Sequence, residues 1–238
     1  MIDFSNQTVM ITGASGNLSA ALVRKYFDAG ALFVLLARSP EKLRGLYPQI
    51  SQNPDRFLIE KVDLTNPNSM DQTVKNAIQQ FGRIDVLLNT VGGYRAGDAL
   101  HETSLDTLNF MFTLNLESVF TACKAVIPTM LDQNHGKIIN IAARPGLKGI
   151  ANGSAYSAAK SGVIRLTESM AAELKFEGIN VNCVLPGTID TPQNRQSMPD
   201  SDFTRWVKPE QIADVILFLT SNRAIAINGA AIPVYGKS

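Results

Sequence analysis

Short apolar runs of strand length alternate along this chain with longer stretches of helical spacing, and this alternation restricts the fold more than any other feature. Parallel strands need a crossover connection of a dozen or more residues, usually a helix, so the pattern is typical of βαβ units. We therefore predict an α/β fold with one doubly wound parallel sheet of about seven strands, flanked by helices. The expected strands are Thr8–Thr12, Leu32–Ala37, Phe57–Val62, Val86–Asn89, Lys137–Ile141, Asn180–Leu185 and Ala230–Val234.

Capping residues delimit one helix clearly. Asn66 and Pro67 predict its N-cap and first residue, and Gly82 predicts its end after Phe81. Residues 186–207 are the least regular part of the chain. A structureless stretch of about 20 residues is uncommon inside a compact domain, so we expect a loop over the substrate. The alternative is a plain exposed connection.

Composition excludes several classes of protein. The 22 basic and 21 acidic residues leave a net charge of +1, so no bulk attraction to nucleic acid or membrane is expected. Cys123 and Cys183 stand in no metal-ligand or disulfide-motif spacing, which predicts buried thiols and no metal site. With no signal-peptide start and no long uninterrupted apolar run, we expect a cytoplasmic protein. No linker or repeat divides residues 1–238, which we expect to form a single domain.

The first expected strand runs into residues 12–19, TGASGNLS, at the start of a helical stretch. Small residues let the backbone turn tightly and approach a pyrophosphate, whose charge the free N–H groups of the following helix stabilise. Glycines in such a turn often only close a tight connection, which is the alternative here. Their place on the first strand of an alternating chain favours a dinucleotide site of the Rossmann type.

The residue at the end of the second strand faces the adenosine ribose in such a fold. An acid there accepts hydrogen bonds from both ribose hydroxyls of NAD and repels the 2′-phosphate of NADP. This chain instead has Arg38, followed by Ser39, and a guanidinium suits a phosphate. The pattern favours NADP(H) over NAD(H), the alternative being a solvated surface arginine.

Tyr156 and Lys160 place a phenol and an ammonium four residues apart, on one face of an expected helix. A neighbouring cation lowers the pKa of a phenol. We therefore expect Tyr156 to exchange a proton closer to neutral pH than its free pKa of about 10 would allow. Taken alone, the pair also fits an exposed helical surface.

Together these segments resemble the short-chain dehydrogenase/reductase family over essentially the whole chain. The landmarks stand in the family's order: the glycine segment, Asp63-Leu64, Asn89-Thr90-Val91-Gly92, Asn115, Tyr156 with Lys160, and Pro186-Gly187-Thr188. The resemblance implies an NAD(P)H-dependent oxidoreductase acting on a small molecule. It also implies a homo-oligomer, a dimer or tetramer, paired through the helical stretches Leu105–Met130 and Ala155–Phe176.

The resemblance also implies roles for individual residues. Tyr156 is the expected proton donor, Lys160 holds the nicotinamide ribose, and Asn115 orders a water chain to Lys160. Asp63 and Leu64 contact adenine, Asn89 supports the sheet beside the cofactor, and Pro186 to Thr188 cover the nicotinamide. The cofactor-binding residues so implied are Gly13, Ser15, Gly16, Asn17, Leu18, Arg38, Ser39, Asp63, Leu64, Asn89, Val91, Gly92, Tyr156, Lys160, Pro186, Gly187 and Thr188.

Two positions depart from the family pattern. Ser19 stands at the last glycine of the glycine segment, where a small side chain still permits close helix packing. Ala143 stands 13 positions before Tyr156, where ketone-reducing members carry a serine hydroxyl that polarises the carbonyl. Losing such a donor commonly costs on the order of 10²–10³ in rate. Ser154 is a conceivable substitute, which we expect instead to cap the helix.

The segment after the sixth strand resembles dihydropteridine reductases, as do residues 91–94 and 142–145; that subgroup carries alanine in place of the serine. The resemblance implies reduction of a planar conjugated substrate such as a quinonoid dihydropterin. Two alternatives stay open: a carbonyl or quinone reductase, and a catalytically weak NADP-binding sensor or scaffold. Aromatic residues Tyr94 and Trp206 either stack on the substrate or only pack the loop. Arg95 and Arg144 either meet a polar substrate edge or are solvated.

Overall fold

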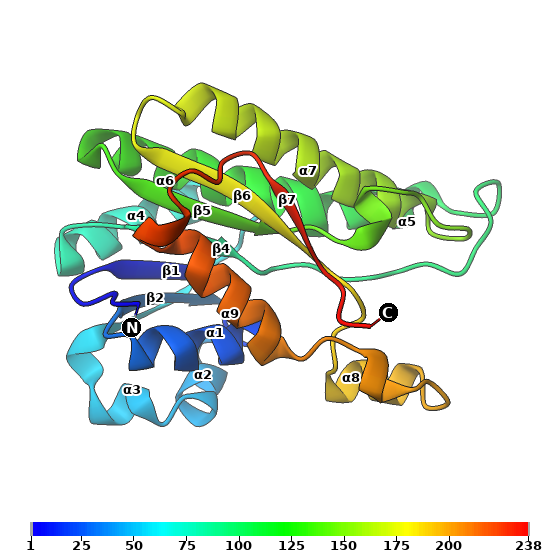
Figure 1. Cartoon of the computed structure of the whole chain (residues 1–238), viewed down its shortest axis with the longest axis horizontal. Helices are drawn as coiled ribbons and strands as arrows, with labels where there is room; N and C mark the ends of the chain where they lie inside the picture. Colours follow the sequence, from blue (N-terminus) through cyan, green and yellow to red (C-terminus); the bar gives the residue numbers. More distant parts are fainter. Residues whose placement is uncertain (1, 238) are drawn as a thin grey trace.

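Seven parallel strands form one sheet in the computed structural model, which describes residues 2–237 (Figure 1). Their order is β3-β2-β1-β4-β5-β6-β7, so the chain builds outward from β1 in one direction and then from β4 in the other. This confirms the predicted doubly wound α/β fold, and every expected strand is present with its ends within one residue of the prediction. The strands are β1 (Thr8–Thr12), β2 (Leu32–Ala37), β3 (Phe57–Lys61), β4 (Val86–Asn89), β5 (Gly136–Ile141), β6 (Ile179–Pro186) and β7 (Ala231–Val234).

Helices cover both faces of the sheet (Figure 1). α1 and α9 pack together on one face, and α4, α6 and α7 lie on the other. The helices are α1 (Asn17–Asp28), α2 (Glu41–Leu46), α3 (Gln49–Gln52), α4 (Pro67–Phe81), α5 (Leu105–Phe112), α6 (Ser118–Gln133), α7 (Ser154–Leu174), α8 (Pro192–Ser197) and α9 (Pro209–Thr220).

Side chains of each strand alternate between two apolar cores, one on each face of the sheet. On β1, Val9 and Ile11 belong to the core covered by α1 and α9, whereas Met10 belongs to the core covered by α4, α6 and α7. All five residues of β1 are buried. Parallel strands buried on both faces read as continuous apolar runs, which is why the sequence delimits them so well.

The capping residues of α4 act as predicted. The Asn66 side chain accepts a hydrogen bond from the Asn68 backbone N–H at 3.1 Å, and Pro67 is the first helical residue. Gly82 ends the helix in the left-handed conformation, with φ +75°. Glycine adopts this conformation without the steric cost that a side chain brings.

The apolar stretch Leu105–Gln133 is continuous in space but not a regular α-helix. Between α5 and α6 lies a π-helical segment, Thr113–Glu117. The whole stretch Leu105–Gln133 has the length and the mean hydropathy, 1.3, of a membrane span, whereas we expected no apolar run of that kind from the sequence. However, 44% of the apolar window is buried inside the fold, where α6 packs on α4 and the π-helical segment packs on α7. The buried part of the stretch is therefore apolar because it packs in the core beside this sheet.

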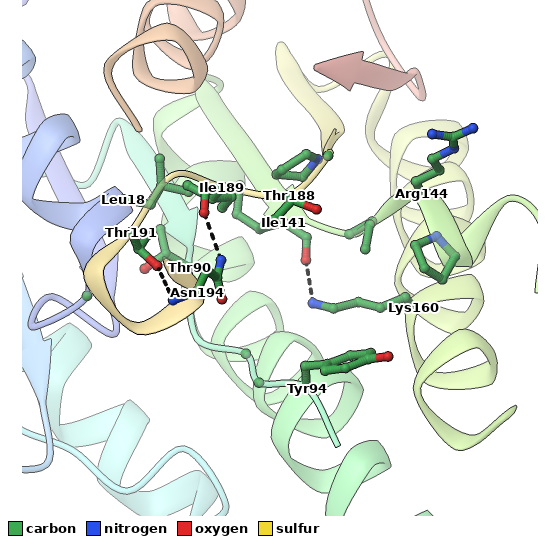
Figure 2. A pocket seen from close by; sticks show the side chains of 18 of the residues that line it. Leu18, Thr90, Tyr94, Ile141, Arg144, Lys160, Thr188, Ile189, Thr191 and Asn194 are labelled. Carbon is green, nitrogen blue, oxygen red and sulfur yellow. Dashed lines mark hydrogen bonds between the residues drawn. The ribbon is translucent and has the colours of Figure 1, made fainter. Parts of the chain in front are cut away.

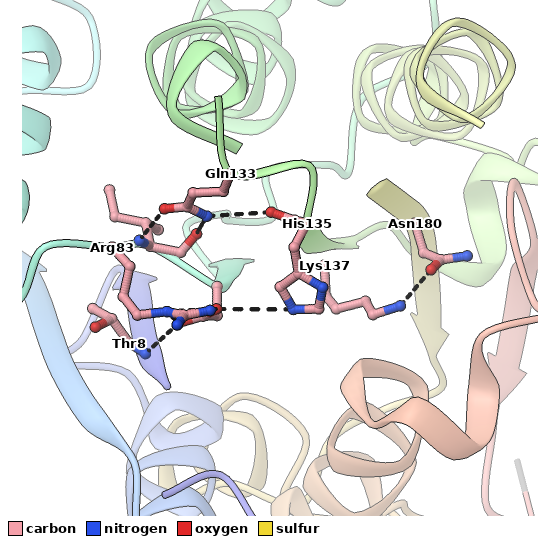
Figure 3. A network of polar contacts seen from close by, with 8 residues as sticks. Thr8, Arg83, Gln133, His135, Lys137 and Asn180 are labelled. Atoms are coloured by element: carbon pink, nitrogen blue, oxygen red, sulfur yellow. Dashed lines mark hydrogen bonds and ion pairs between the residues drawn. The ribbon is translucent and has the colours of Figure 1, made fainter. Parts of the chain in front are cut away.

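Polar groups join the amino ends of β1, β4 and β5, at the edge of the sheet opposite to the cavities described below (Figure 3). The buried carboxylate of Asp85 accepts hydrogen bonds from the Thr8 backbone N–H and from Arg83 Nε, both at 2.8 Å. His135 Nε2 lies 3.8 Å from the same carboxylate. Burial lowers the pKa of His135, which keeps its imidazole neutral near pH 7.

Residues 186–207 are more ordered than their sequence suggests. The two ends of the segment meet in a parallel bridge between Ile189 and Val207, with a hydrogen bond from Asp190 N to Val207 O at 2.8 Å. Between these ends the chain forms the short helix α8. The excursion is thus a closed loop that projects from one end of the sheet, as Figure 1 shows for α8.

Candidate active site

Two adjoining cavities lie at the carboxyl ends of the central strands, where the strand order reverses between β1 and β4. The larger cavity has a volume of about 620 Å³ and the smaller about 420 Å³. They share Gly16, Thr90, Val91 and Gly92 and so form one elongated cleft. This is where open parallel α/β sheets bind ligands.

The glycine turn after β1 packs tightly against the loop after β4. Gly13 has φ +65°, and a Cβ atom there would lie 2.9 Å from Val91 Cγ2. Ser19 is buried, and its hydroxyl donates to Gly13 O at 2.9 Å and lies 2.7 Å from Thr90 Oγ1. The serine in the last glycine position therefore fits beneath the turn and braces it. The turn keeps the close backbone approach that a pyrophosphate needs.

The smaller cavity contains two charges that sit just beyond neighbouring strands. Arg38 follows β2 and is exposed, and Asp63 follows β3. Asp63 accepts hydrogen bonds from the Thr65 hydroxyl at 2.7 Å and backbone N–H at 2.9 Å. These bonds, together with the charge of Arg38, hold the pKa of Asp63 below its usual value. Arg38 makes no ion pair within residues 2–237, so its guanidinium is available to an anionic ligand.

Lys160 lies at the floor of the larger cavity (Figure 2). Its ammonium donates to the carbonyl oxygen of Ile141, at the end of β5, at 2.8 Å. Burial lowers the pKa of Lys160 to about 8. A Cβ atom at Gly92 would lie 3.2 Å from Lys160 Nζ and 3.0 Å from Asn115 Oδ1, so the loop after β4 runs between these two side chains.

Asn115 is fully buried in the π-helical segment and holds the loop after β4 in place. Its Nδ2 donates to Gly93 O and to Met111 O, each at 3.1 Å, and its Oδ1 accepts from Gly93 N at 3.1 Å. The side chain thus binds both polar groups of one peptide residue. It lies behind the cavity wall, not among the residues that line it.

Tyr156 lines the larger cavity, but its pKa moves in the direction opposite to our expectation. Burial raises the pKa of Tyr156 to about 12, and the phenol of Tyr94 adds to the rise. The physical reason is the loss of water around the phenol, and the Lys160 ammonium, which donates to the Ile141 carbonyl, does not offset it. Tyr156 and Lys160 both line the larger cavity from α7, but the spacing on the helix did not predict the loss of water around the phenol.

Ala143, at the position where ketone-reducing family members carry a serine, lies in the wall of the larger cavity. Ala143 is buried, lines the larger cavity and offers only a methyl group. Ser154 is the first residue of α7, and the residue before it, Gly153, makes no side-chain cap, so our prediction that Ser154 caps the helix is wrong. Within residues 2–237, Ser154 is not part of either cavity wall.

Most of the predicted cofactor residues line the cleft, and two do not. Ser39 lies outside both cavities. Asn89 is buried inside the sheet, where its Nδ2 donates to Asn140 Oδ1 at 2.9 Å and Cys123 Sγ at 3.3 Å. The predicted residues found in the walls are Gly13, Ser15, Gly16, Asn17, Leu18, Arg38, Asp63, Leu64, Val91, Gly92, Tyr156, Lys160, Pro186, Gly187 and Thr188.

Of the aromatic and basic side chains expected near the substrate, two line the larger cavity and two lie outside both cavities. Tyr94 lines the larger cavity, and Arg144 stands at its rim (Figure 2), with its guanidinium 5.2 Å from the ring centre of Tyr235. Trp206 is buried against Phe203 and lines neither cavity, so of its two expected roles it has that of packing the loop. Arg95 likewise lies outside the walls, over the ring of Phe110.

The loop of residues 186–207 covers one side of the larger cavity. Asn194, on α8, donates to Ile189 O at 2.8 Å, and its backbone N–H is capped by the Thr191 hydroxyl (Figure 2). The side chain of Asn17, at the start of α1, donates to Gln193 Oε1 at 2.8 Å. The loop therefore reaches across to the glycine turn.

Sequence reasoning did not select several residues that complete the walls. In the smaller cavity these come from α5 and the π-helical segment, whose approach to the glycine turn no local pattern reveals. The position of Ile150 follows from the loop conformation. The residues in question are Ile141, Ile150, Phe110, Thr113, Leu114 and Ser118, whereas Thr90, Asn194 and Met198 belong to segments that the sequence did single out.

Comparison with known proteins gives consistent matches over nearly the whole chain. The sequence model of the short chain dehydrogenase family matches residues 7–202. The (2S)-[(R)-hydroxy(phenyl)methyl]succinyl-CoA dehydrogenase subunit BbsD of Thauera aromatica is 34% identical, over 97% of this chain and 96% of its own length. The 3-oxoacyl-[acyl-carrier-protein] reductase FabG of Thermotoga maritima is 31% identical, over 95% of each chain. Among solved structures, an NAD⁺-bound xylitol dehydrogenase superposes with a TM-score of 0.90 at 26% identity, covering 98% of this chain and 99% of its own.

Proposed function

The chain belongs to the short-chain dehydrogenase/reductase family and is an NAD(P)H-dependent oxidoreductase acting on a small molecule, and we propose that it reduces a planar conjugated substrate with NADPH. The single observation that carries the substrate proposal is Ala143. It places a methyl group in the wall of the cavity that contains Tyr156, where a carbonyl reductase of this family has a hydroxyl.

The cleft has the features that a dinucleotide requires. The glycine turn packs closely against the loop at Val91, leaving exposed backbone at the start of α1 for a pyrophosphate. Asp63 and Leu64 line the smaller cavity, where the adenine would lie, and Pro186 to Thr188 line the larger one beside the nicotinamide position. Bound NADPH supplies the hydride, while the residues of this chain orient the substrate and deliver a proton.

We assign the proton transfer to Tyr156, supported by Lys160 and Asn115. Tyr156 keeps its proton at neutral pH because burial raises its pKa to about 12, which suits an acid that protonates the reduced product. Lys160 carries the positive charge at the cavity floor, within reach of both Ile141 and the ribose position. Asn115 acts through the Gly93 peptide that it holds.

The preference for NADPH rests on Arg38. Its guanidinium is exposed in the smaller cavity and has no carboxylate ligand in the described chain. Asp63 stands just beyond the end of the neighbouring strand, and its carboxylate already accepts hydrogen bonds from the Thr65 backbone N–H and hydroxyl. A 2′-phosphate next to Arg38 would gain charge-assisted hydrogen bonds, whereas the two ribose hydroxyls of NADH would find no acid at that position.

For the substrate we propose a conjugated, already electrophilic ring system such as a quinonoid dihydropterin. Hydride addition to such a ring depends less on a polarising hydroxyl than addition to an isolated ketone does. Residues 91–94 and 142–145 supply much of the cavity wall, and Arg144 and Tyr94 offer a cation and an aromatic face at its rim. We assign substrate recognition to these residues and to the loop of residues 186–207, within one domain spanning the chain.

Two other functions remain as alternatives. A carbonyl or quinone reductase is favoured by the name of the 3-oxoacyl reductase relative, which reduces a ketone. A catalytically weak NADP-binding sensor or scaffold is favoured by Ala143 alone.

The assay that separates the three functions is NADPH oxidation with a quinonoid dihydropterin, ketones and quinones, using wild type and Tyr156→Phe. Turnover of the dihydropterin, lost in Tyr156→Phe, supports the proposal; turnover of ketones only supports the carbonyl reductase, and tight NADPH binding without any turnover supports the sensor.

We further propose a cytoplasmic homo-oligomer, a dimer or tetramer. Large apolar side chains stand exposed along α5 and α6: Leu105, Phe110, Phe120 and Leu131. Exposed apolar side chains of this kind are what a second subunit covers. The buried free thiols of Cys123 and Cys183 suit a reducing compartment. Light scattering at micromolar concentration tests the oligomer, and a monomer would contradict it.

A further inference from the structure

A second phenol lies beside Tyr156 in the larger cavity. The ring centres of Tyr94 and Tyr156 are 4.9 Å apart, with the ring planes at 88°, an edge-to-face contact. Tyr94 is nevertheless 64% exposed, so most of its ring faces the cavity and its mouth. In Figure 2 the Tyr94 side chain extends beneath Lys160, with its hydroxyl directed to the side from which Lys160 enters the cavity.

The backbone that carries Tyr94 is fixed. The preceding residue, Gly93, is held at both its N–H and its carbonyl by the Asn115 side chain, at 3.1 Å each. A Cβ atom at Gly93 would lie 2.6 Å from Leu114 Cδ2, so the chain lies directly against the π-helical segment. A fixed backbone with an exposed ring is suited to place a hydroxyl repeatedly in one region of the cavity.

The other hydroxyl groups of the larger cavity are committed elsewhere or stand on other walls. Ser19 and Thr90 bond each other and the backbone of the glycine turn. Thr191 caps α8, and Thr188 follows the Pro186-Gly187 turn on the nicotinamide side. Among the described wall residues this leaves Tyr94 as the hydroxyl that stands next to Tyr156.

We propose that the Tyr94 hydroxyl gives a hydrogen bond to the heteroatom of the conjugated substrate that Tyr156 protonates, and so substitutes in part for the donor that Ala143 lacks. Tyr94 stays protonated throughout: it stabilises the charge that develops on this atom, and the proton that is transferred comes from Tyr156. The inference rests on the proposed function, because it supplies a second donor for the same reduction. The effect of the Tyr94 phenol on the pKa of Tyr156 agrees with two hydroxyls that share one region.

The test compares wild type, Tyr94→Phe, Ala143→Ser and the double variant, each with the best substrate found for wild type. Tyr94→Phe keeps the ring and removes only the hydroxyl. We expect kcat to fall between about 10- and 100-fold, somewhat less than for a typical oxyanion donor because the substrate is conjugated. The Kd for NADPH should stay within about twofold of wild type, since Tyr94→Phe keeps the ring in the larger cavity and leaves the smaller cavity, where the adenine and 2′-phosphate are proposed to lie, unchanged.

Rescue separates a donor from a structural role. In the Tyr94→Phe background, Ala143→Ser should restore kcat to within about threefold of wild type, because it returns a hydroxyl to the same atom. A Tyr94→Phe variant as fast as wild type overturns the proposal, as does a slow one that Ala143→Ser does not rescue. Absence of turnover in wild type with all substrates would instead remove the proposed function and this inference together.

Discussion

The ammonium of Lys160 donates to the carbonyl oxygen of Ile141 at 2.8 Å, and this bond joins the second turn of α7 to the end of β5 at the floor of the cleft. The charge is buried, and its pKa falls to about 8. The fold therefore carries a destabilising charge at the point where the cofactor ribose is proposed to bind. The buried ammonium thus lowers the stability of the fold at a position where it serves the proposed cofactor binding.

Lys160→Met should stabilise the protein while abolishing turnover. A fall in pKa from 10.5 to about 8 corresponds to a penalty of about 3 kcal/mol for the charged lysine. The penalty is fully present below pH 8, where the lysine is charged both folded and unfolded, and it disappears as pH rises toward 10.5. The free energy of unfolding from urea titrations at pH 7 and pH 10 checks this. The gain of Lys160→Met should be largest at pH 7; an equal gain at both pH values would contradict the account.

Arg38→Asp should weaken NADPH binding on the order of 10²-fold and leave NADH binding unchanged or stronger. The exposed guanidinium lines the smaller cavity, so its loss acts on a ligand and not on the fold. Fluorescence titration of both cofactors measures the two Kd values. Arg44→Asp, on the exposed face of α2 outside both cavities, is the matched control for a change of two charges. Equal weakening of both cofactors would mean that Arg38 does not meet the 2′-phosphate.

Asp85→Ala should lower the free energy of unfolding by about 2–4 kcal/mol without changing the Kd for NADPH. The substitution leaves the Thr8 N–H without its acceptor and Arg83 without its partner. Asp85 stands at the amino edge of the sheet, whereas the cleft lies at the carboxyl edge. Asp55→Ala, at an exposed position, is the control. A weakened cofactor affinity in Asp85→Ala, measured below the onset of unfolding, would show that the two edges are coupled.

The strands and the location of the cleft follow from the sequence, but several properties of individual side chains do not. Val9 to Ile11 form a run buried on both faces, which needs no tertiary information to recognise. The pKa of Tyr156 depends on how much water the neighbouring loops exclude, which its spacing from Lys160 does not encode. The role of Trp206 also depends on the tertiary fold: its indole ring could stack on a ligand, but it packs on Phe203.

The loop of residues 186–207 and the π-helical segment show the same limit. Prolines predicted irregular structure in the loop, yet the bridge between Ile189 and Val207 joins residues too far apart for any local pattern to pair. Asn115 was selected by resemblance, but its position in a π-helical segment and its two hydrogen bonds to Gly93 were not predicted. Such features are set by tertiary contacts, and they lie at the proposed site.

We propose that this oxidoreductase acts on a conjugated substrate in a cavity without a hydroxyl on residue 143. The most direct measurement is kcat/KM for a quinonoid dihydropterin and for a simple ketone, in wild type and in Ala143→Ser. We expect wild type to prefer the dihydropterin by at least about 10²-fold, and Ala143→Ser to raise ketone turnover about tenfold or more with little change for the dihydropterin. A wild type that reduces the ketone as well as the dihydropterin, with no gain from Ala143→Ser, would contradict the account.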